Sequence, residues 1–161
     1  MTGKTHAAAG ILCGALISAQ LELPFEQNAA VIACSFAGSL LPDIDICTSR
    51  LGRRIAPVSA AIQILVGHRT VFHGLLIYAI AAAFGWANLP DYRLLVFSTG
   101  AGVLSHLFLD ALNPSGVPLF WPFHWRFRIA GFHTGGVFEW ILDAVMLLML
   151  MHLIILFLSV R

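Results

Sequence analysis

Residues 136–160 read GVFEWILDAVMLLMLMHLIILFLSV, and this stretch decides the class of fold. Glu139 and Asp143 lie near its beginning, and within the stretch no acidic or basic residue other than His152 follows them. A helix needs roughly 20 predominantly apolar residues to cross the hydrocarbon core of a bilayer. The stretch is therefore predicted to form a membrane-spanning helix.

The composition of the whole chain agrees with a membrane protein. Of its 161 residues, 59% are hydrophobic and 11% are charged, and the mean hydropathy is +0.87. Soluble domains carry about 25% charged residues, so one soluble core could not hide this much apolar surface. The net charge of +1 is too small to indicate a nucleic-acid-binding surface, so nucleic acid is not expected as a partner. The length predicts a single domain over residues 1–161.

Four further apolar segments precede the one at the C-terminal end. They cover Thr5–Leu21, Asn28–Leu41, Thr70–Ala87 and Leu94–Leu112. Together they predict an all-α fold, an integral membrane bundle of about five spans with a short interfacial aromatic loop. Five spans would place most basic residues on one side, so the positive-inside rule predicts a cytoplasmic N-terminus.

Histidines and carboxylates gather on that same side. Ionisable groups at membrane depth are costly, face the bundle interior and mark functional sites. His106 and Asp110 are four residues apart, so both lie on one helix face. Histidine with carboxylate suits zinc, manganese or iron(II). We expect one or two divalent ions, zinc first, held by His6, Asp43, His68, His73, His106 and Asp110.

Three other residues are candidates for catalysis. Asp45 or Glu139 could act as a general base, and Arg69 could hold a phosphate oxygen. The alternatives are structural: Asp45 could pair with a nearby arginine, and Glu139 could form an outer pair with Asp143. A water acidified by the ion would attack phosphorus.

The connection from Asn113 to Gly135 is rich in aromatic residues. Apolar and basic residues alternate from Phe123 to Ile129, which predicts an extended strand or hairpin on the membrane interface. Trp121, Arg126 and Arg128 are candidates for contact with lipid headgroups. The alternative is a plain aromatic belt without specific binding.

Four motifs, in their order along the chain, carry a family resemblance. THAAAG holds His6, LLPDID holds Asp43 and Asp45, GHRTVFHG holds His68 and His73, and SHLFLDALNPSG holds His106 and Asp110. The chain resembles the YdjM-type, LexA-regulated family of bacterial inner-membrane metal-dependent hydrolases. That family is distantly similar to zinc-dependent phospholipases C and single-strand nucleases. The resemblance implies an inner-membrane location and, by analogy, phosphoester hydrolysis.

The expected function is hydrolysis of a lipid or lipid-linked phosphoester at the cytoplasmic membrane face, with membrane lipid as the partner. A divalent-metal transporter is one alternative, although an ion pathway needs polar groups through the whole membrane. A non-catalytic membrane assembly protein is the other. The residues do not name the substrate, so amide or ester hydrolysis stays open.

Overall fold

A computed structural model describes residues 1–45, 71–123 and 125–159. These ranges are helical apart from turns and loops, and no strand occurs in them, so the predicted all-α class is confirmed. The elements are α1 (Gly3–Gln20), α2 (Phe25–Leu40), η1 (Leu41–Asp45), η2 (Val71–His73), α5 (Leu75–Asn88), η3 (Pro90–Tyr92), α6 (Arg93–Ala111) and α7 (Val137–Ser159).

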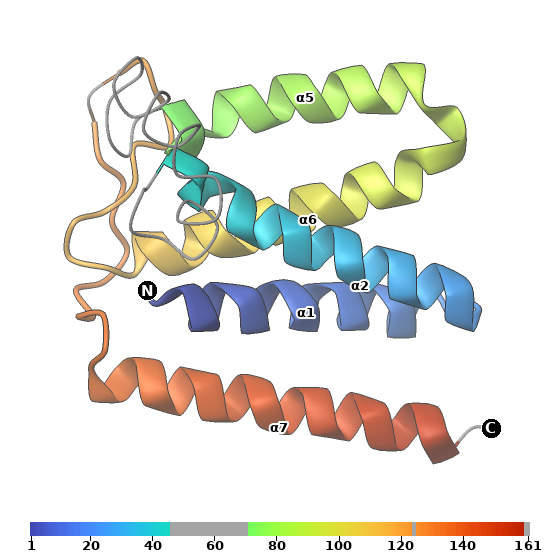
Figure 1. Cartoon of the computed structure of the whole chain (residues 1–161). Helices are drawn as coiled ribbons and strands as arrows, with labels where there is room; N and C mark the ends of the chain where they lie inside the picture. The colour runs from blue at the N-terminus through green and yellow to red at the C-terminus, as the bar shows by residue number, and fades with distance from the viewer. Residues whose placement is uncertain (46–70, 124, 160–161) are drawn as a thin grey trace.

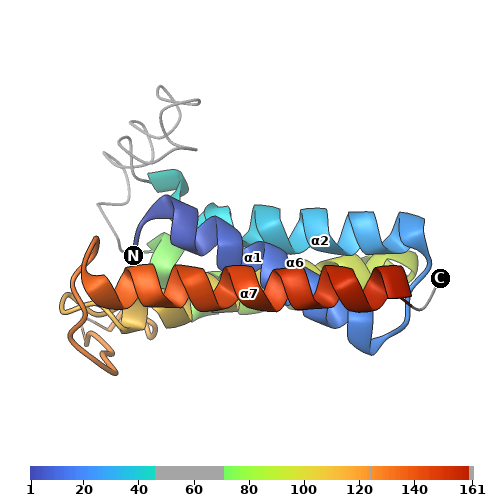
Figure 2. The same ribbon diagram turned by 90° about the horizontal axis from the view of Figure 1, so that it is seen from below.

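The long helices lie side by side with their axes roughly aligned (Figures 1 and 2). Successive helices run in opposite directions, so chain segments far apart in sequence meet at one end of the bundle. We call this the polar end. It contains Met1, η1 and η2, together with the last residues of α6 and the first residues of α7 (Figure 1).

Helices α1, α2 and α6 form the closely packed centre of the bundle. Small residues bring their backbones together: a Cβ on Gly102 would overlap the Ser35 carbonyl oxygen, and one on Gly38 would overlap the Thr99 carbonyl oxygen. Membrane helices commonly pack in this way, through small residues that permit close approach. The position of α6 against α2 is therefore set by backbone contact, and α6 carries two of the candidate ligands.

Helix α7 is attached more loosely, because its main contacts are with α1. Two helical stretches in the described ranges are long and apolar enough to cross a membrane: Pro90–Ala111 and Val137–Ser159. Almost none of the second is buried within the protein, and large apolar side chains such as Leu148 and Ile154 are exposed on it. This is the surface expected of a helix that faces lipid. The predicted number of five spans stays a prediction.

The aromatic loop closes over the C-terminal end of α6. One antiparallel bridge joins Val117 and Phe127, whose amides donate to each other's carbonyl oxygens at 2.9 and 2.8 Å. The Ile129 amide then donates to the Ala111 carbonyl oxygen at 2.8 Å. In the described part of the loop, this single bridge replaces the predicted strand or hairpin. The physical reason is that the loop amides satisfy carbonyl groups left open at the helix end.

Candidate metal centre

Five of the predicted side chains meet at the polar end. His6 lies in the first turn of α1, Asp43 in η1, and His73 is the last residue of η2. His106 and Asp110 occupy the last two turns of α6. All but the half-buried Asp43 are buried, with 0–4% of their surface exposed. Buried groups of this kind require partners or a bound ion, since isolation from water is costly.

Asp110 is at the centre of this cluster. Its Oδ1 atom accepts a hydrogen bond from the Met1 amine at 2.9 Å and lies 3.2 Å from His6 Nε2. Its Oδ2 atom lies 3.5 Å from His106 Nε2 and 3.7 Å from His73 Nε2. The last two separations are long for hydrogen bonds. Ligand atoms around a tetrahedral zinc ion are separated by roughly 3.4 Å, given zinc–nitrogen distances near 2.0–2.1 Å. The spacing therefore fits ligands that share an ion.

The orientation of His106 is fixed by the backbone of α2. His106 Nδ1 lies 2.7 Å from the Ser39 carbonyl oxygen. A carbonyl oxygen only accepts, so Nδ1 carries the proton and Nε2 keeps its lone pair. Among the described residues Nε2 has no hydrogen-bond partner, and it lies 3.8 Å from Asp43 Oδ1. Histidines that ligate metals are typically held in this way, with the second ring nitrogen donating to a carbonyl or carboxylate.

Two groups of three ligand atoms overlap at His106. One is His6, His106 and Asp110, and the other is Asp43, His73 and His106; within each group all atoms lie within 4.8 Å of one another. The rings of His6 and His106 stack, with centroids 3.7 Å apart and planes 15° apart. Two imidazolium cations at this separation would repel each other. The stacking therefore favours neutral rings, the form in which histidine binds metal ions.

Besides Glu139, the structure describes four further predicted residues: Asp45, Trp121, Arg126 and Arg128. His68 and Arg69 lie outside the described residues, and Asp45 is the last residue of η1. Trp121, Arg126 and Arg128 are exposed on the aromatic loop, so they are not part of the buried cluster. The guanidinium groups donate to the carbonyl oxygens of Ser115 (from Arg126, 3.4 Å) and Pro114 (from Arg128, 3.2 Å).

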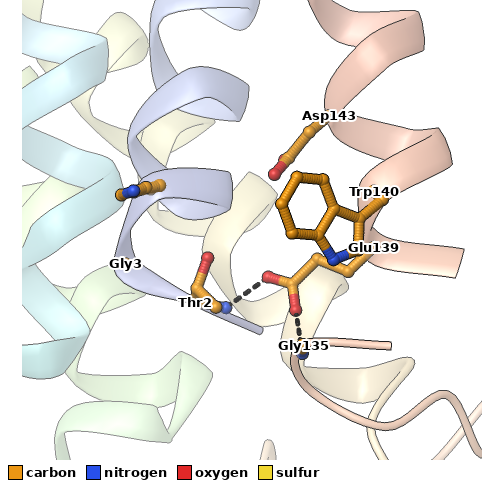
Figure 3. Close-up of a pocket in the computed structure, with 7 residues that line it drawn as sticks. Thr2, Gly3, Gly135, Glu139, Trp140 and Asp143 are labelled. Carbon is orange, nitrogen blue, oxygen red and sulfur yellow. Dashed lines mark hydrogen bonds between the residues drawn. The ribbon is translucent and has the colours of Figure 1, made fainter. Parts of the chain in front are cut away.

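Glu139 joins the beginning of α7 to the beginning of α1. One carboxylate oxygen accepts from the Thr2 amide and the Thr5 hydroxyl, and the other accepts from the Gly135 amide at 2.6 Å (Figure 3). The side chain is only 2% exposed. Both oxygens are thus engaged, which indicates a role in positioning the two helices. Its predicted role as a general base is not tested by this geometry.

Replacement of Glu139 by glutamine should loosen the start of α7. The amide offers one acceptor oxygen in place of two, so it leaves one buried donor unsatisfied at a cost of about 1–3 kcal/mol. Hydrogen exchange of the amides in the first turns of α7 should become faster. Glu22→Gln, at the opposite end of α1, is the matched control and should leave this exchange unchanged. Equal exchange in the wild type and in Glu139→Gln would contradict the positioning role.

Sequence reasoning missed the groups that hold the candidate ligands in place. The Ser39 carbonyl and the Met1 amine are backbone groups. The residue type at these positions therefore gives no signal of their role. Thr2 left a weak signal, because threonine is one of the preferred N-cap residues at a helix start. Thr2 does cap α1: its hydroxyl accepts from the Thr5 amide at 3.4 Å.

The fold and the cluster define a helical membrane protein with a buried histidine–aspartate centre. The chain belongs to the YdjM inner membrane protein family, which it matches over residues 1–161. It is 35% identical over 144 residues to inner membrane protein YdjM of Escherichia coli (strain K12), covering 80% of this chain and 69% of that protein. It is 33% identical over 141 residues to the uncharacterized protein YvsG of Bacillus subtilis (strain 168), covering 86% of this chain and 84% of that protein. No solved structure matches the chain.

These matches confirm the predicted family. They also confirm the inner-membrane location, because both the family and the Escherichia coli relative carry that location in their names. The distant similarity to zinc-dependent phospholipases C stays a prediction, as does the predicted single-domain organisation.

Proposed function

We propose that this protein is a membrane-embedded, metal-dependent hydrolase that cleaves a lipid or lipid-linked phosphoester at the cytoplasmic membrane face. One observation carries the proposal: His106 presents an unpartnered Nε2 lone pair to two carboxylates, while the Ser39 carbonyl fixes the ring. A histidine that served only to tie helices together would be expected to use both ring nitrogens in hydrogen bonds.

The donor set fits a divalent transition metal. His73, His106 and Asp110 would hold the ion, with Asp43 on one side of the set and His6 on the other. Nitrogen and carboxylate donors suit zinc best, with manganese or iron as alternatives. When bound, such an ion supplies Lewis-acid chemistry, which polarises a phosphoryl oxygen and brings the pKa of water towards neutrality.

The remaining roles belong to residues around this cluster. Asp45 ends η1 two residues after Asp43, so its backbone position suits a general base beside the ligands. Arg69 precedes η2 and would hold a phosphate oxygen. Glu139 would hold the beginnings of α1 and α7 in their relative positions. Trp121 and the two loop arginines would meet the headgroup region of the bilayer.

The distribution of basic residues supports a cytoplasmic location for the polar end. Of the four described basic residues, Lys4, Arg126 and Arg128 lie at or near this end, whereas Arg93 begins α6 at the opposite end. By the positive-inside rule, this distribution favours a cytoplasmic Met1. The 18 residues of α1 give a helix about 27 Å long at 1.5 Å per residue. This length is close to the thickness of the hydrocarbon core, so α1 could be one of five spans.

Chelation of the metal is the experiment that tests this function. Detergent-purified protein is expected to hydrolyse bis(p-nitrophenyl) phosphate or a phospholipid phosphoester, to lose this activity after treatment with a chelator, and to regain it with zinc or manganese. Protein that contains stoichiometric metal but hydrolyses no phosphoester would contradict the proposal. So would metal flux into proteoliposomes without hydrolysis, which is the behaviour of a transporter.

A further inference from the structure

A histidine lies on the outer face of the apolar helix α7. His152 is seven residues, about 10 Å, before the end of this helix at Ser159, so it lies within the apolar length of the candidate span. Its side chain is exposed, and no hydrogen bond or ion pair joins it to another of the described residues. Histidines inside membrane spans almost always face the interior of a bundle or a water-filled cavity. The position of His152 therefore indicates that another molecule covers this face of α7.

This face of α7 points away from the rest of the bundle. On the inner side, Met146 packs in one cluster with Ala9 and Leu12 of α1. At 100° per residue, Leu148 lies about 160° around the helix from Met146, and His152 lies about 120° from it. Helix α7 is also at the edge of the bundle, next to α1 (Figure 1). A second molecule could therefore reach this face without moving α1.

The residues on the outer face repeat with the spacing of a coiled coil. We define them as the α7 seam, which consists of Ile141, Val145, Leu148, His152, Ile155 and Ser159, all of them exposed. Alternating intervals of four and three residues keep such a row directed at a partner helix. Helices in membranes commonly pack at the same small angle as helices in coiled coils. The seam thus has the pattern of a helix–helix contact, with one histidine among apolar side chains.

The histidine suits a second copy of this chain as the partner. Two copies inserted in the same orientation are parallel, and two-fold symmetry places each seam residue opposite its own counterpart. His152 would then meet the His152 of the second copy. A neutral imidazole has one donor and one acceptor nitrogen, so two such rings can share a hydrogen bond without burying a charge. A single polar residue in an apolar seam also specifies the register of the two helices.

A cavity beside the seam offers room for the second helix. It measures about 380 Å³, and Val145, Leu148 and His152 of the seam line it together with Leu16 of α1. Its remaining lining residues, Met149 and Leu153, are apolar. Apolar side chains of a second α7 could pack into this hollow, and their packing would cover His152 from lipid.

We propose that the protein forms a parallel dimer in the membrane through the α7 seam, with the His152 rings of the two copies joined by a hydrogen bond. This association is independent of the proposed hydrolysis, because the seam shares no residue with the histidine–aspartate cluster at the polar end. Loss of the dimer and loss of metal-dependent activity are therefore separate results.

Oxidative cross-linking of the full chain in membranes tests which face of α7 is in contact. With the three native cysteines replaced by alanine, Leu148→Cys and Ile155→Cys place a thiol in the seam. Leu147→Cys and Ile154→Cys are the matched controls on the adjacent face, and the four native side chains are similarly exposed, at 57–65%. Cross-linked dimers should form at residues 148 and 155 and be absent at 147 and 154. Equal cross-linking at all four positions, a preference for 147 and 154, or none at any position would overturn the proposal.

Sedimentation equilibrium in density-matched detergent then measures the contribution of His152. His152→Leu should raise the dissociation constant of the dimer roughly three- to tenfold, the loss typical of an interhelical hydrogen bond in a membrane. His152→Gln can also donate and accept, so it should keep the constant within about twofold of the wild type. Ile154→Ala, outside the seam, is the matched control and should leave the constant unchanged. A monomeric wild type, or equal constants for the wild type and His152→Leu, would refute the proposed contact.

Discussion

Replacement of Asp110 by asparagine is expected to lower the affinity for the bound metal at least 100-fold. Loss of groups that only orient a ligand typically costs about 10–100-fold in metal affinity, and Asp110 is placed as a ligand itself. Its two oxygens lie among three histidine nitrogens. Asparagine keeps the size of the side chain but removes the negative charge. Elemental analysis by inductively coupled plasma mass spectrometry would report the metal content of the purified protein.

The matched control for this experiment is Asp91→Asn, which removes an exposed carboxylate far from the cluster. It should retain the one or two equivalents of metal expected in the wild type. The same elution volume for the three proteins would show that the bundle is intact. Full metal content in Asp110→Asn would exclude Asp110 as a ligand, and no metal in the wild type would remove the basis of the proposed function.

Asp110 is also the residue whose loss should be hardest to compensate. It accepts hydrogen bonds from the Met1 amine and from the Asn113 side chain at 3.1 Å, so its carboxylate is held before any ion binds. Preorganised ligands of this kind lose little entropy on binding. Asp43, in contrast, is partly exposed and comes from a short 3-10 helix. We therefore expect a smaller loss of metal from Asp43→Asn than from Asp110→Asn.

The sequence predicted the helices and the meeting of the ligands well, for identifiable physical reasons. Long apolar runs determine α6 and α7 almost independently of tertiary context. The four-residue spacing of His106 and Asp110 determines that they share a helix face. Antiparallel helices then bring His6 and His73 to the same end as this pair, and the structure does place them together.

Other features depend on contacts that no local pattern encodes. The Ser39 carbonyl reaches His106 only because α2 and α6 pack closely, and the sequence positions involved are 67 residues apart. The alternation from Phe123 to Ile129 predicted a strand, but the loop directs its amides to the end of α6 instead. Glu139 was predicted as a general base or as an outer partner of Asp143 because it lies on the same membrane side as the other ionisable residues. Its contacts to two helix starts are visible only in three dimensions.

Gly102→Leu is expected to destabilise the bundle more than any other single substitution discussed above. A Cβ at residue 102 would overlap the Ser35 carbonyl oxygen and would lie 2.9 Å from the Ser39 amide. Backbone atoms cannot rotate away as a side chain can, so α2 and α6 must separate. We expect a loss of at least about 3 kcal/mol, the upper range for overpacked cores. This corresponds to a decrease in Tm of roughly 10 °C in a protein of this size.

Thermal unfolding in detergent, followed by circular dichroism, would measure the effect. Gly100→Leu is the matched control: it lies in the same helix, and beyond its own helix backbone and chain neighbours no atom of the described residues lies within 4 Å of a Cβ built there. Leucine also favours the helix more than glycine does, so this control should be as stable as the wild type. Separation of α2 from α6 would move Ser39 away from His106, so Gly102→Leu should also reduce metal content in the protein that remains folded. Equal Tm values for the two glycine variants would show that close backbone packing does not hold the candidate metal centre together.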